Sequence, residues 1–256
     1  MPGKYFWKTS DSIGIVPLPK VSASTTNSAD TLKSNVITTL TNYNTNTLQK
    51  FDSIYRHSKL TGLIDGTDSS ILSNITNIKI RKNFTPTLAS STRYDIYFRN
   101  ALFNPHSGHN STAGGILTST GFKVTGSDIE QFLDDDGQGN VRRYYLASGI
   151  RTYSNETQGT INYNSGQITL NSLNIASISN IRGTTSTVIE LTVTPNSNDV
   201  VPVRNQILEI DTLNTLVTAN VDSASSSGTA FSNTTTGSTT TTTVTTPSTT
   251  PPTSAY

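Results

Sequence analysis

The fold is decided by residues 51–84, which read FDSIYRHSKLTGLIDGTDSSILSNITNIKIRKNF. The first half of this stretch predicts a short helix, because Ser58 is a favourable N-cap and Asp65-Gly66 is a helix stop. Its apolar residues recur at helical spacing and are expected to face inward: Leu60, Leu63 and Ile64.

The second half of the same stretch predicts a strand that begins near Ile75 and is closed by Pro86. Apolar residues there recur at every second position, which is typical of a half-buried strand. One face carries Ile78, Ile80 and Phe84, and the other carries Lys79 and Arg81.

A longer amphipathic helix is predicted upstream, from Asp30 to about Tyr43. Ser28 is placed to cap it, and its apolar residues form one stripe: Leu32, Val36, Leu40 and Tyr43. The residues NYNTN at 42–46 are poor helix formers and are expected to end it.

The remainder of the chain alternates between short strands and turns. Residues 93–99 repeat the period-two pattern, and the short loop before them favours antiparallel pairing with the preceding strand. Two hairpins are predicted, one around DDDGQGN at 134–140 and one around Asn164-Ser-Gly166. Thr187–Val193, Val200–Ile210 and Leu216–Val221 supply the last strands.

The predicted fold class is α+β, mainly β. An N-terminal helix and a short helix pack with strands in an α+β domain at residues 1–100, and an antiparallel β-rich domain follows at 101–222. Residues 223–256 form a low-complexity Ser/Thr-rich tail. This tail has little to bury and is expected to be disordered alone, or to become an extended arm against a neighbouring subunit.

The composition limits the classes of partner and of chemistry that we expect for this protein. Charged residues are 14% of the chain and the formal net charge is +1, which gives no global reason to expect nucleic acid or an anionic membrane as partner. The chain has no cysteine, so disulfide and thiol chemistry are excluded. No apolar run approaches the roughly 18–20 residues needed to cross a bilayer, and the N-terminus lacks a signal-peptide core.

Motifs that could carry chemistry have plainer interpretations. His106 and His109 lie in a polar loop without the further ligands that a structural metal site needs. Asp134 and Asp136 imitate the start of a calcium loop, but the closing acidic position falls at Tyr145, so an acidic hairpin turn is favoured over a weak Ca²⁺ site. No nucleophile, phosphate or dinucleotide motif is present, and we predict no catalytic residue, no metal and no cofactor.

The region around the opening stretch resembles the large wedge protein family of T-even-type contractile phage baseplates. The similarity is carried by TLQKF, RHSKL, LID, SILSN and IKIRK at residues 47–51, 56–60, 63–65, 70–74 and 78–82. Pieces that resemble the same family in the same order follow at 98–100 (FRN), 159–163 (GTINY) and 202–205 (PVRN). The chain corresponds to the C-terminal portion of longer family members, as a fragment, a split gene or a compact homologue.

The resemblance implies a non-enzymatic virion protein of a contractile tail. Family members pair with a second copy of themselves and join other wedge proteins in a ring around the tail hub. The protein is accordingly expected in the baseplate of the virion, and in the host cytoplasm during assembly, without nucleic acid or membrane as partner.

Six residues are candidate interface positions: Tyr55, Lys59, Asp65, Asp68, Lys79 and Arg81. The apolar neighbours Leu60, Leu63, Ile78 and Ile80 are expected to build the core instead. Two other functions stay open from the residues alone. The β-rich half and the Thr-rich tail also suit a tail-fibre or adhesin-like module that recognises a host surface or glycan, and a carbohydrate-active enzyme is a weaker third reading.

Overall fold

A computed structural model describes residues 10–22, 27–107, 115–202, 207–212, 217–218, 220–224 and 231–234. His109 and most of the Ser/Thr-rich tail, at residues 235–256, lie outside the described residues.

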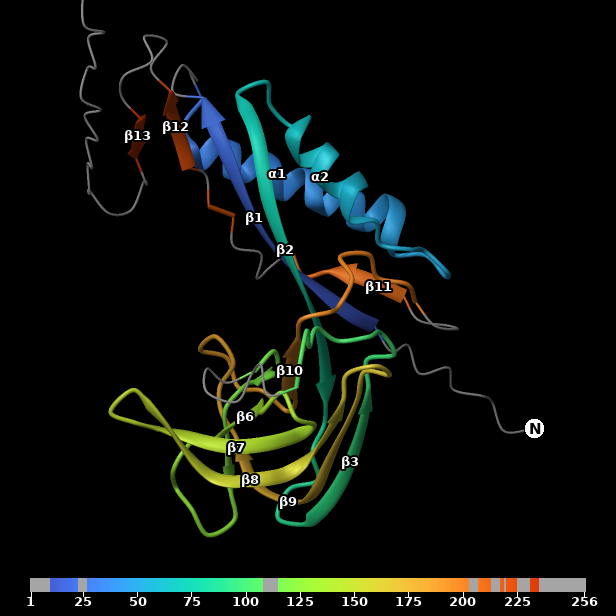
Figure 1. Ribbon diagram of the computed structural model, residues 1–256, viewed down its shortest axis with the longest axis vertical. Helices are drawn as coiled ribbons and strands as arrows, with labels where there is room; N and C mark the ends of the chain where they lie inside the picture. Colours follow the sequence, from blue (N-terminus) through green and yellow to red (C-terminus); the bar gives the residue numbers. More distant parts are fainter. Residues whose placement is uncertain are drawn as a thin grey trace, which may run out of the picture. The chain divides into compact units, whose positions relative to one another are not determined.

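Two α-helices, a short π-helix and 13 strands make up the described part of the chain (Figure 1). The helices are α1 (Ala29–Tyr43), η1 (Asn44–Leu48) and α2 (His57–Asp65). The first strands are β1 (Ser10–Ser22), β2 (Ile71–Phe84), β3 (Ser91–Tyr97), β4 (Thr118–Ser119), β5 (Phe122–Val124) and β6 (Phe132–Asp135). They are followed by β7 (Asn140–Ala147), β8 (Ile150–Asn162), β9 (Gln167–Ile178), β10 (Ile189–Val193), β11 (Ile207–Ile210), β12 (Asn220–Ala224) and β13 (Phe231–Thr234). The predicted class, α+β and mainly β, is confirmed at this level.

The chain forms two compact units, each assembled from separated segments. The first contains Met1–Ile15, Thr41–His57 and Asn77–Asn214, and the second contains Val16–Leu40, Ser58–Thr76 and Thr215–Tyr256. Strands β1 and β2 therefore each contribute residues to both units.

In the second unit, helices pack along the β1–β2 pair (Figure 1). Ser28 caps α1 as predicted, because its Oγ accepts a hydrogen bond from the backbone N–H of Thr31 at 3.1 Å. The predicted apolar stripe is buried at Leu32, Val36 and Leu40, and Leu32 packs against Val21 of β1. Neither helix of the described residues is long and apolar enough to span a membrane.

The end of α1 differs from the prediction. Helical structure continues beyond Tyr43 as the π-helical turn η1. In the first unit, buried Asn44 accepts a hydrogen bond through Oδ1 from the backbone N–H of Ile210 at 2.7 Å, and Leu48 is fully buried. These tertiary contacts outweigh the low helix propensity of the Asn/Thr run.

The short helix α2 begins two residues earlier than predicted, at His57, so Ser58 lies within it and is not its N-cap. Leu60 and Ile64 are fully buried as expected, whereas Leu63 is 41% exposed. The prediction that Leu63 faces inward was wrong. In this nine-residue helix only Leu60 and Ile64, which are four residues apart, form the buried face.

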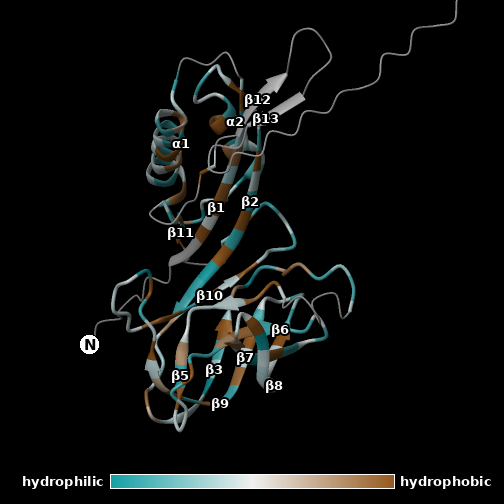
Figure 2. Ribbon diagram, turned by 90° about the vertical axis from the view of Figure 1, so that its left-hand side faces the viewer, coloured by the Kyte–Doolittle hydropathy of each residue, from teal (hydrophilic) through white to brown (hydrophobic). Residues whose placement is uncertain are grey.

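Strand β2 starts at Ile71, earlier than expected, and alternates between buried and exposed positions along Thr76, Ile78 and Ile80. Figure 2 shows both hydrophobic and hydrophilic residues along this strand. The predicted pairing of β2 with β3 was wrong. β2 pairs antiparallel with β10 from Ile80 to Phe84, and β3 pairs antiparallel with β9. The two strands belong to different sheets, and Phe84 instead packs against Tyr94 of β3, with ring centroids 5.1 Å apart.

The first unit contains a sheet in the order β3-β9-β8-β7-β6, with β5 paired to β9. Both predicted hairpins are present, β6–β7 and β8–β9, and both pair antiparallel. Gly166 closes the second at φ 67°, and a Cβ there would lie 2.3 Å from the carbonyl oxygen of Asn100, so the turn needs glycine. The predicted inward residues Ile189, Leu191 and Val193 of β10 are fully buried.

The late strands depart from an all-antiparallel arrangement. In the first unit β11 pairs parallel with β1, and in the second unit β12 pairs parallel with the other end of β1. The first residues of the predicted tail also form structure, since β13 pairs antiparallel with β12.

Candidate functional site

The six predicted interface residues have different environments. Lys59, Asp65 and Lys79 are exposed, and Asp68 and Arg81 are half-buried. Tyr55 is fully buried within the first unit, where its backbone forms an antiparallel bridge with Val200. Burial raises the pKa of its hydroxyl, with smaller contributions from Tyr43 and Asp199. Its side chain is therefore part of the core of this chain.

Asp199 organises the segment that follows Tyr55. Its Oδ1 accepts the backbone N–H of His57 at 2.9 Å, and its Oδ2 accepts Nη1 of Arg56 at 2.7 Å. These two bonds, the backbone one first, hold the pKa of Asp199 below its ordinary value. A carboxylate at the first N–H of a helix is a favourable cap, so Asp199 takes the role that the sequence assigned to Ser58.

Arg81 is held by acidic residues within the first unit. Its Nη1 lies 2.7 Å from Oδ2 of Asp211 and 3.5 Å from Oε2 of Glu190. Glu190 also pairs with Arg182 at 3.0 Å. Most of the charge of Arg81 is thus neutralised inside the chain, which leaves Lys79 as the exposed cation on this part of β2.

In the second unit, polar contacts tie the end of α2 to the start of β2. Asn74 donates through Nδ2 to the carbonyl oxygen of Thr61 at 3.1 Å and to Oδ1 of Asp65 at 2.6 Å. The carboxylate of Asp68 accepts hydrogen bonds from the hydroxyl and the backbone N–H of Ser70. These two bonds lower the pKa of Asp68. Asp65 and Asp68 therefore stabilise the turn between α2 and β2.

One edge of β2 is open among the strands that the structure describes. β10 covers this edge only at Ile80–Phe84, and no described strand covers Ile71–Lys79 there. Leu72 and Ile75 are exposed along the open part, Ile75 to 61%. An exposed strand edge with apolar side chains is a template for pairing with another chain.

The acidic turn predicted from DDDGQGN is a buried ionic cluster. Asp134 accepts two hydrogen bonds from Arg142, through Nε at 2.9 Å and Nη2 at 3.2 Å. It also accepts Nη1 of Arg151 at 2.8 Å and the hydroxyl of Tyr153 at 2.9 Å. Burial raises the pKa of Asp134, and the bonds from Arg142 and Tyr153 oppose that shift. Both oxygens of this carboxylate therefore accept hydrogen bonds from protein donors.

The two neighbouring acids are also engaged. Asp135 accepts the backbone N–H of Leu117 at 2.8 Å and the hydroxyl of Tyr163 at 2.6 Å. Asp136 accepts the backbone N–H groups of Gln138 and Asn140 at 2.8 and 3.0 Å. The preferred interpretation of a hairpin turn is confirmed, with its carboxylates used as internal acceptors.

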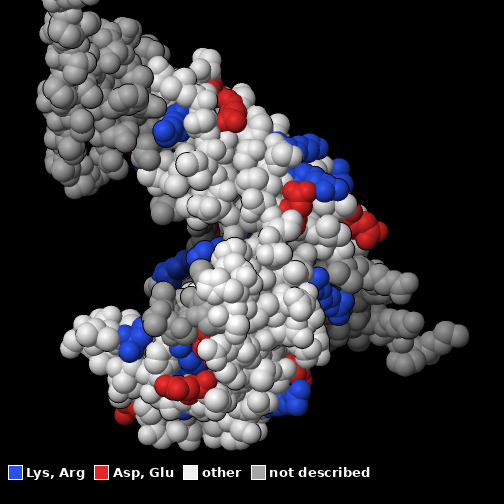
Figure 3. Space-filling view, in the orientation of Figure 1, with Lys and Arg blue, Asp and Glu red and all other residues white. Residues whose placement is uncertain are grey.

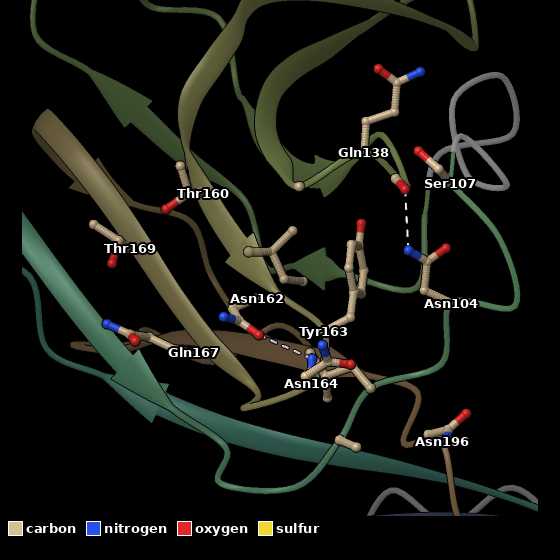
Figure 4. Close-up of a pocket in the computed structure, with 15 residues that line it drawn as sticks. Asn104, Ser107, Gln138, Thr160, Asn162, Tyr163, Asn164, Gln167, Thr169 and Asn196 are labelled. Atoms are coloured by element: carbon tan, nitrogen blue, oxygen red, sulfur yellow. Dashed lines mark hydrogen bonds between the residues drawn. The ribbon is translucent and has the colours of Figure 1, made fainter.

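A polar pocket lies beside this turn, in the first unit (Figure 4). Its volume is about 660 Å³, within the range of small-molecule sites. Side chains from five segments line it: Asn104 and Ser107, Gln138, Thr160 to Asn164, Gln167 and Thr169, and Asn196. The sequence does not reveal this site, because its lining residues come from five separate segments. The pairing of β8 with β9 brings only part of the set together, and the contributions of 104–107 and 196 have no local signal.

Charge does not mark any single patch on the face seen in Figure 3. Lysine, arginine, aspartate and glutamate are scattered there among a larger area of uncharged residues. This distribution agrees with a chain whose formal net charge is +1.

Residues 21–83 match a family model described as baseplate structural protein gp6, C-terminal domain III. This match supports a structural protein of the phage baseplate, which is located in the virion tail and interacts with other baseplate proteins. Over these residues the chain is similar to the C-terminal domain III of gp6, and the resemblance to the baseplate wedge protein of contractile phages is confirmed. A search of the curated proteins gives no match.

Proposed function

We propose that the protein is a non-enzymatic wedge subunit of a contractile phage baseplate, which pairs with a second copy of itself and joins other wedge proteins in the ring around the tail hub. The observation that carries this proposal is the match of residues 21–83 to a baseplate structural domain. Assembly from free subunits would take place in the host cytoplasm before incorporation into the virion. We also propose that the chain divides into an α+β domain at residues 1–100, a β-rich domain at 101–222 and a tail at 223–256.

The open edge of β2 is the surface that we assign to self-association. It lies within the matched residues, and no described strand pairs with it from Ile71 to Lys79 on this side. Two copies pairing antiparallel about Ile75 would form a two-fold interface, which is the commonest symmetry of homodimers. In that register Lys79 of each copy faces Ile71 of the other, so no like charges oppose each other.

The remaining exposed candidates are assigned to contacts with other wedge proteins. Lys59 lies on the exposed face of α2, and Asp65 is exposed at its end. Tyr55 would act by holding the neighbouring segment in position, since its side chain is buried.

Size-exclusion chromatography with light scattering tests the self-association. The wild-type chain should be dimeric at about 100 μM, and Ile75→Lys should shift it to monomer, because a buried charge at the centre of the interface is left unpaired. The matched control is Ile150→Lys in β8, where the side chain is 71% exposed and lies away from the edge of β2 in sequence. A monomeric wild type, or an Ile75→Lys dimer as stable as that of the control, would refute the assignment.

A pull-down against separately purified wedge proteins tests the proposed contacts with those proteins. Retention of one of them by the wild-type chain, weakened by reversing the charges at Lys59 and Asp65, supports the proposed ring contacts. Absence of binding to every wedge protein contradicts them.

A further inference from the structure

The pocket in the first unit has a lining with an unusual chemical bias. Of its described lining residues, none is Lys, Arg, His, Asp or Glu, and most carry an amide or a hydroxyl group. Pockets for cofactors and other largely apolar ligands are lined predominantly by hydrophobic side chains with few polar groups. This pocket reverses that balance, so its ligand must offer many hydrogen-bonding groups and no net charge.

Several of these lining groups are not used by the fold. The side chains of Gln138, Asn164 and Asn196 have no hydrogen-bond partner among the described residues. Because each carboxamide both donates and accepts, the three can bind groups that do the same.

Other lining amides are held at one end by hydrogen bonds within the chain and leave the other end of the amide available. Asn162 accepts the backbone N–H of Asn164 and of Ser165 through Oδ1, at 3.0 and 3.1 Å, which leaves its Nδ2 as a donor. Asn104 donates to the carbonyl oxygen of Gly137 at 3.1 Å, and its buried Oδ1 has no partner among the described residues. Figure 4 shows these two amides on either side of the Tyr163 ring.

Tyr163 supplies an aromatic surface at a fixed position. Its hydroxyl donates to Oδ2 of Asp135 at 2.6 Å, and burial raises the pKa of the hydroxyl, so it stays protonated. With its polar end held in this way, the ring presents an apolar wall between amide groups.

We propose that this pocket binds a neutral saccharide. A sugar ring carries hydroxyl groups that donate and accept at once, which suits carboxamides, and C–H faces that suit an aromatic wall. A charged ligand would be buried without a counter-charge, and an apolar ligand would leave the amides unpaired, so both are disfavoured. The pocket lies outside the matched residues 21–83, and this activity is additional to the assembly role.

The test is isothermal titration of the full chain with neutral oligosaccharides of glucose, galactose, mannose and N-acetylglucosamine, up to about 10 mM, with sialylated and sulfated glycans in parallel. At least one neutral saccharide should bind. The double variant Gln138→Ala/Asn164→Ala should weaken it by about tenfold or more, because about two hydrogen bonds are lost. Neither side chain has a hydrogen-bond partner among the residues that the structure describes, so the double variant should fold like the wild type.

The matched control is Asn180→Ala, an exposed asparagine outside the pocket, which should bind like the wild type. Three results would overturn the proposal: no neutral saccharide binding at the highest concentration, binding only by the charged glycans, or equal affinity in the double variant. Because the same samples can be checked for dimerisation, failure here is distinguishable from failure of the assembly proposal.

Discussion

Replacing Asp134 with alanine should be one of the most damaging single changes in the first unit. The side chains of Asp134 and Arg142 are 0% and 8% exposed, so the Arg142 guanidinium would stay buried without its carboxylate. Breaking a buried pair from one side costs about 3–5 kcal/mol. Arg151, with a side chain 32% exposed, can turn to water and adds about 1 kcal/mol or less. The expected fall in the free energy of unfolding is therefore about 3–5 kcal/mol.

Thermal and urea unfolding measure this loss, and hydrogen exchange of peptides from residues 131–178 locates it. For a chain of this size, the loss corresponds to a fall of about 6–20 °C in the melting temperature. The control is Arg93→Ala, which breaks the exposed pair of Arg93 with Asp95 and should cost less than about 1 kcal/mol.

A second variant separates the unpaired charge from the lost volume. Asp134→Leu combined with Arg142→Met removes both charges and should be less destabilised than Asp134→Ala, since an apolar pair can replace a buried ion pair. An Asp134→Ala protein within about 1 kcal/mol of the wild type would refute the account of the cluster.

Two further predictions follow from α2 and the residues before it. Leu60→Ala should lower the free energy of unfolding by about 2–5 kcal/mol because the side chain is fully buried, whereas Leu63→Ala should stay within about 0.5 kcal/mol; equal effects in urea unfolding would contradict the helix face. The pKa of Asp199 should lie below its ordinary value in an NMR carboxyl titration, so its contribution to stability is present above the unfolded pKa and is lost as the pH falls through the folded one. Arg56→Ala should raise that pKa only part of the way, because the larger lowering comes from the backbone N–H of His57; complete recovery of the ordinary value would show that Arg56 alone is responsible.

Local patterns carried much of the secondary structure. Ser28 was identifiable as a cap because the cap bond joins residues three apart, and the hairpin at Asn164-Ser-Gly166 because its turn needs a positive φ. The alternation of apolar and polar residues around Ile78 and Ile80 identified the buried face of β2, because this pattern also depends only on neighbouring residues. In each case the decisive interaction lies within a few residues of the signal.

The predictions that were wrong concern features that depend on residues far apart in the sequence. Asp199 caps α2 from more than a hundred residues away, which no local pattern at Ser58 can reveal. The continuation of α1 into η1 depends on the distant backbone of Ile210. Strand β3 follows β2 closely in sequence, yet β9 supplies its partner, so proximity along the chain predicted the wrong neighbour. The polar pocket belongs to this group as well, since its groups become a site only after five segments meet.

The two proposed activities use different parts of the chain, and this separation has a consequence for the virion. The proposed assembly surface lies within residues 21–83, on the open part of β2, whereas the described lining residues of the pocket lie between 101 and 196. A chain held in the baseplate through β2 would thus display one saccharide pocket per copy.

Individual sugar sites of this kind are weak, but copies fixed in one ring raise the overall avidity by about 10²–10⁴ without any new contact. The Ile75→Lys monomer should therefore keep the affinity of the single site while losing tight binding to a glycan-coated surface, and surface plasmon resonance on such a surface measures both. Equal retention of the monomer and the dimer on that surface would separate assembly from sugar binding altogether.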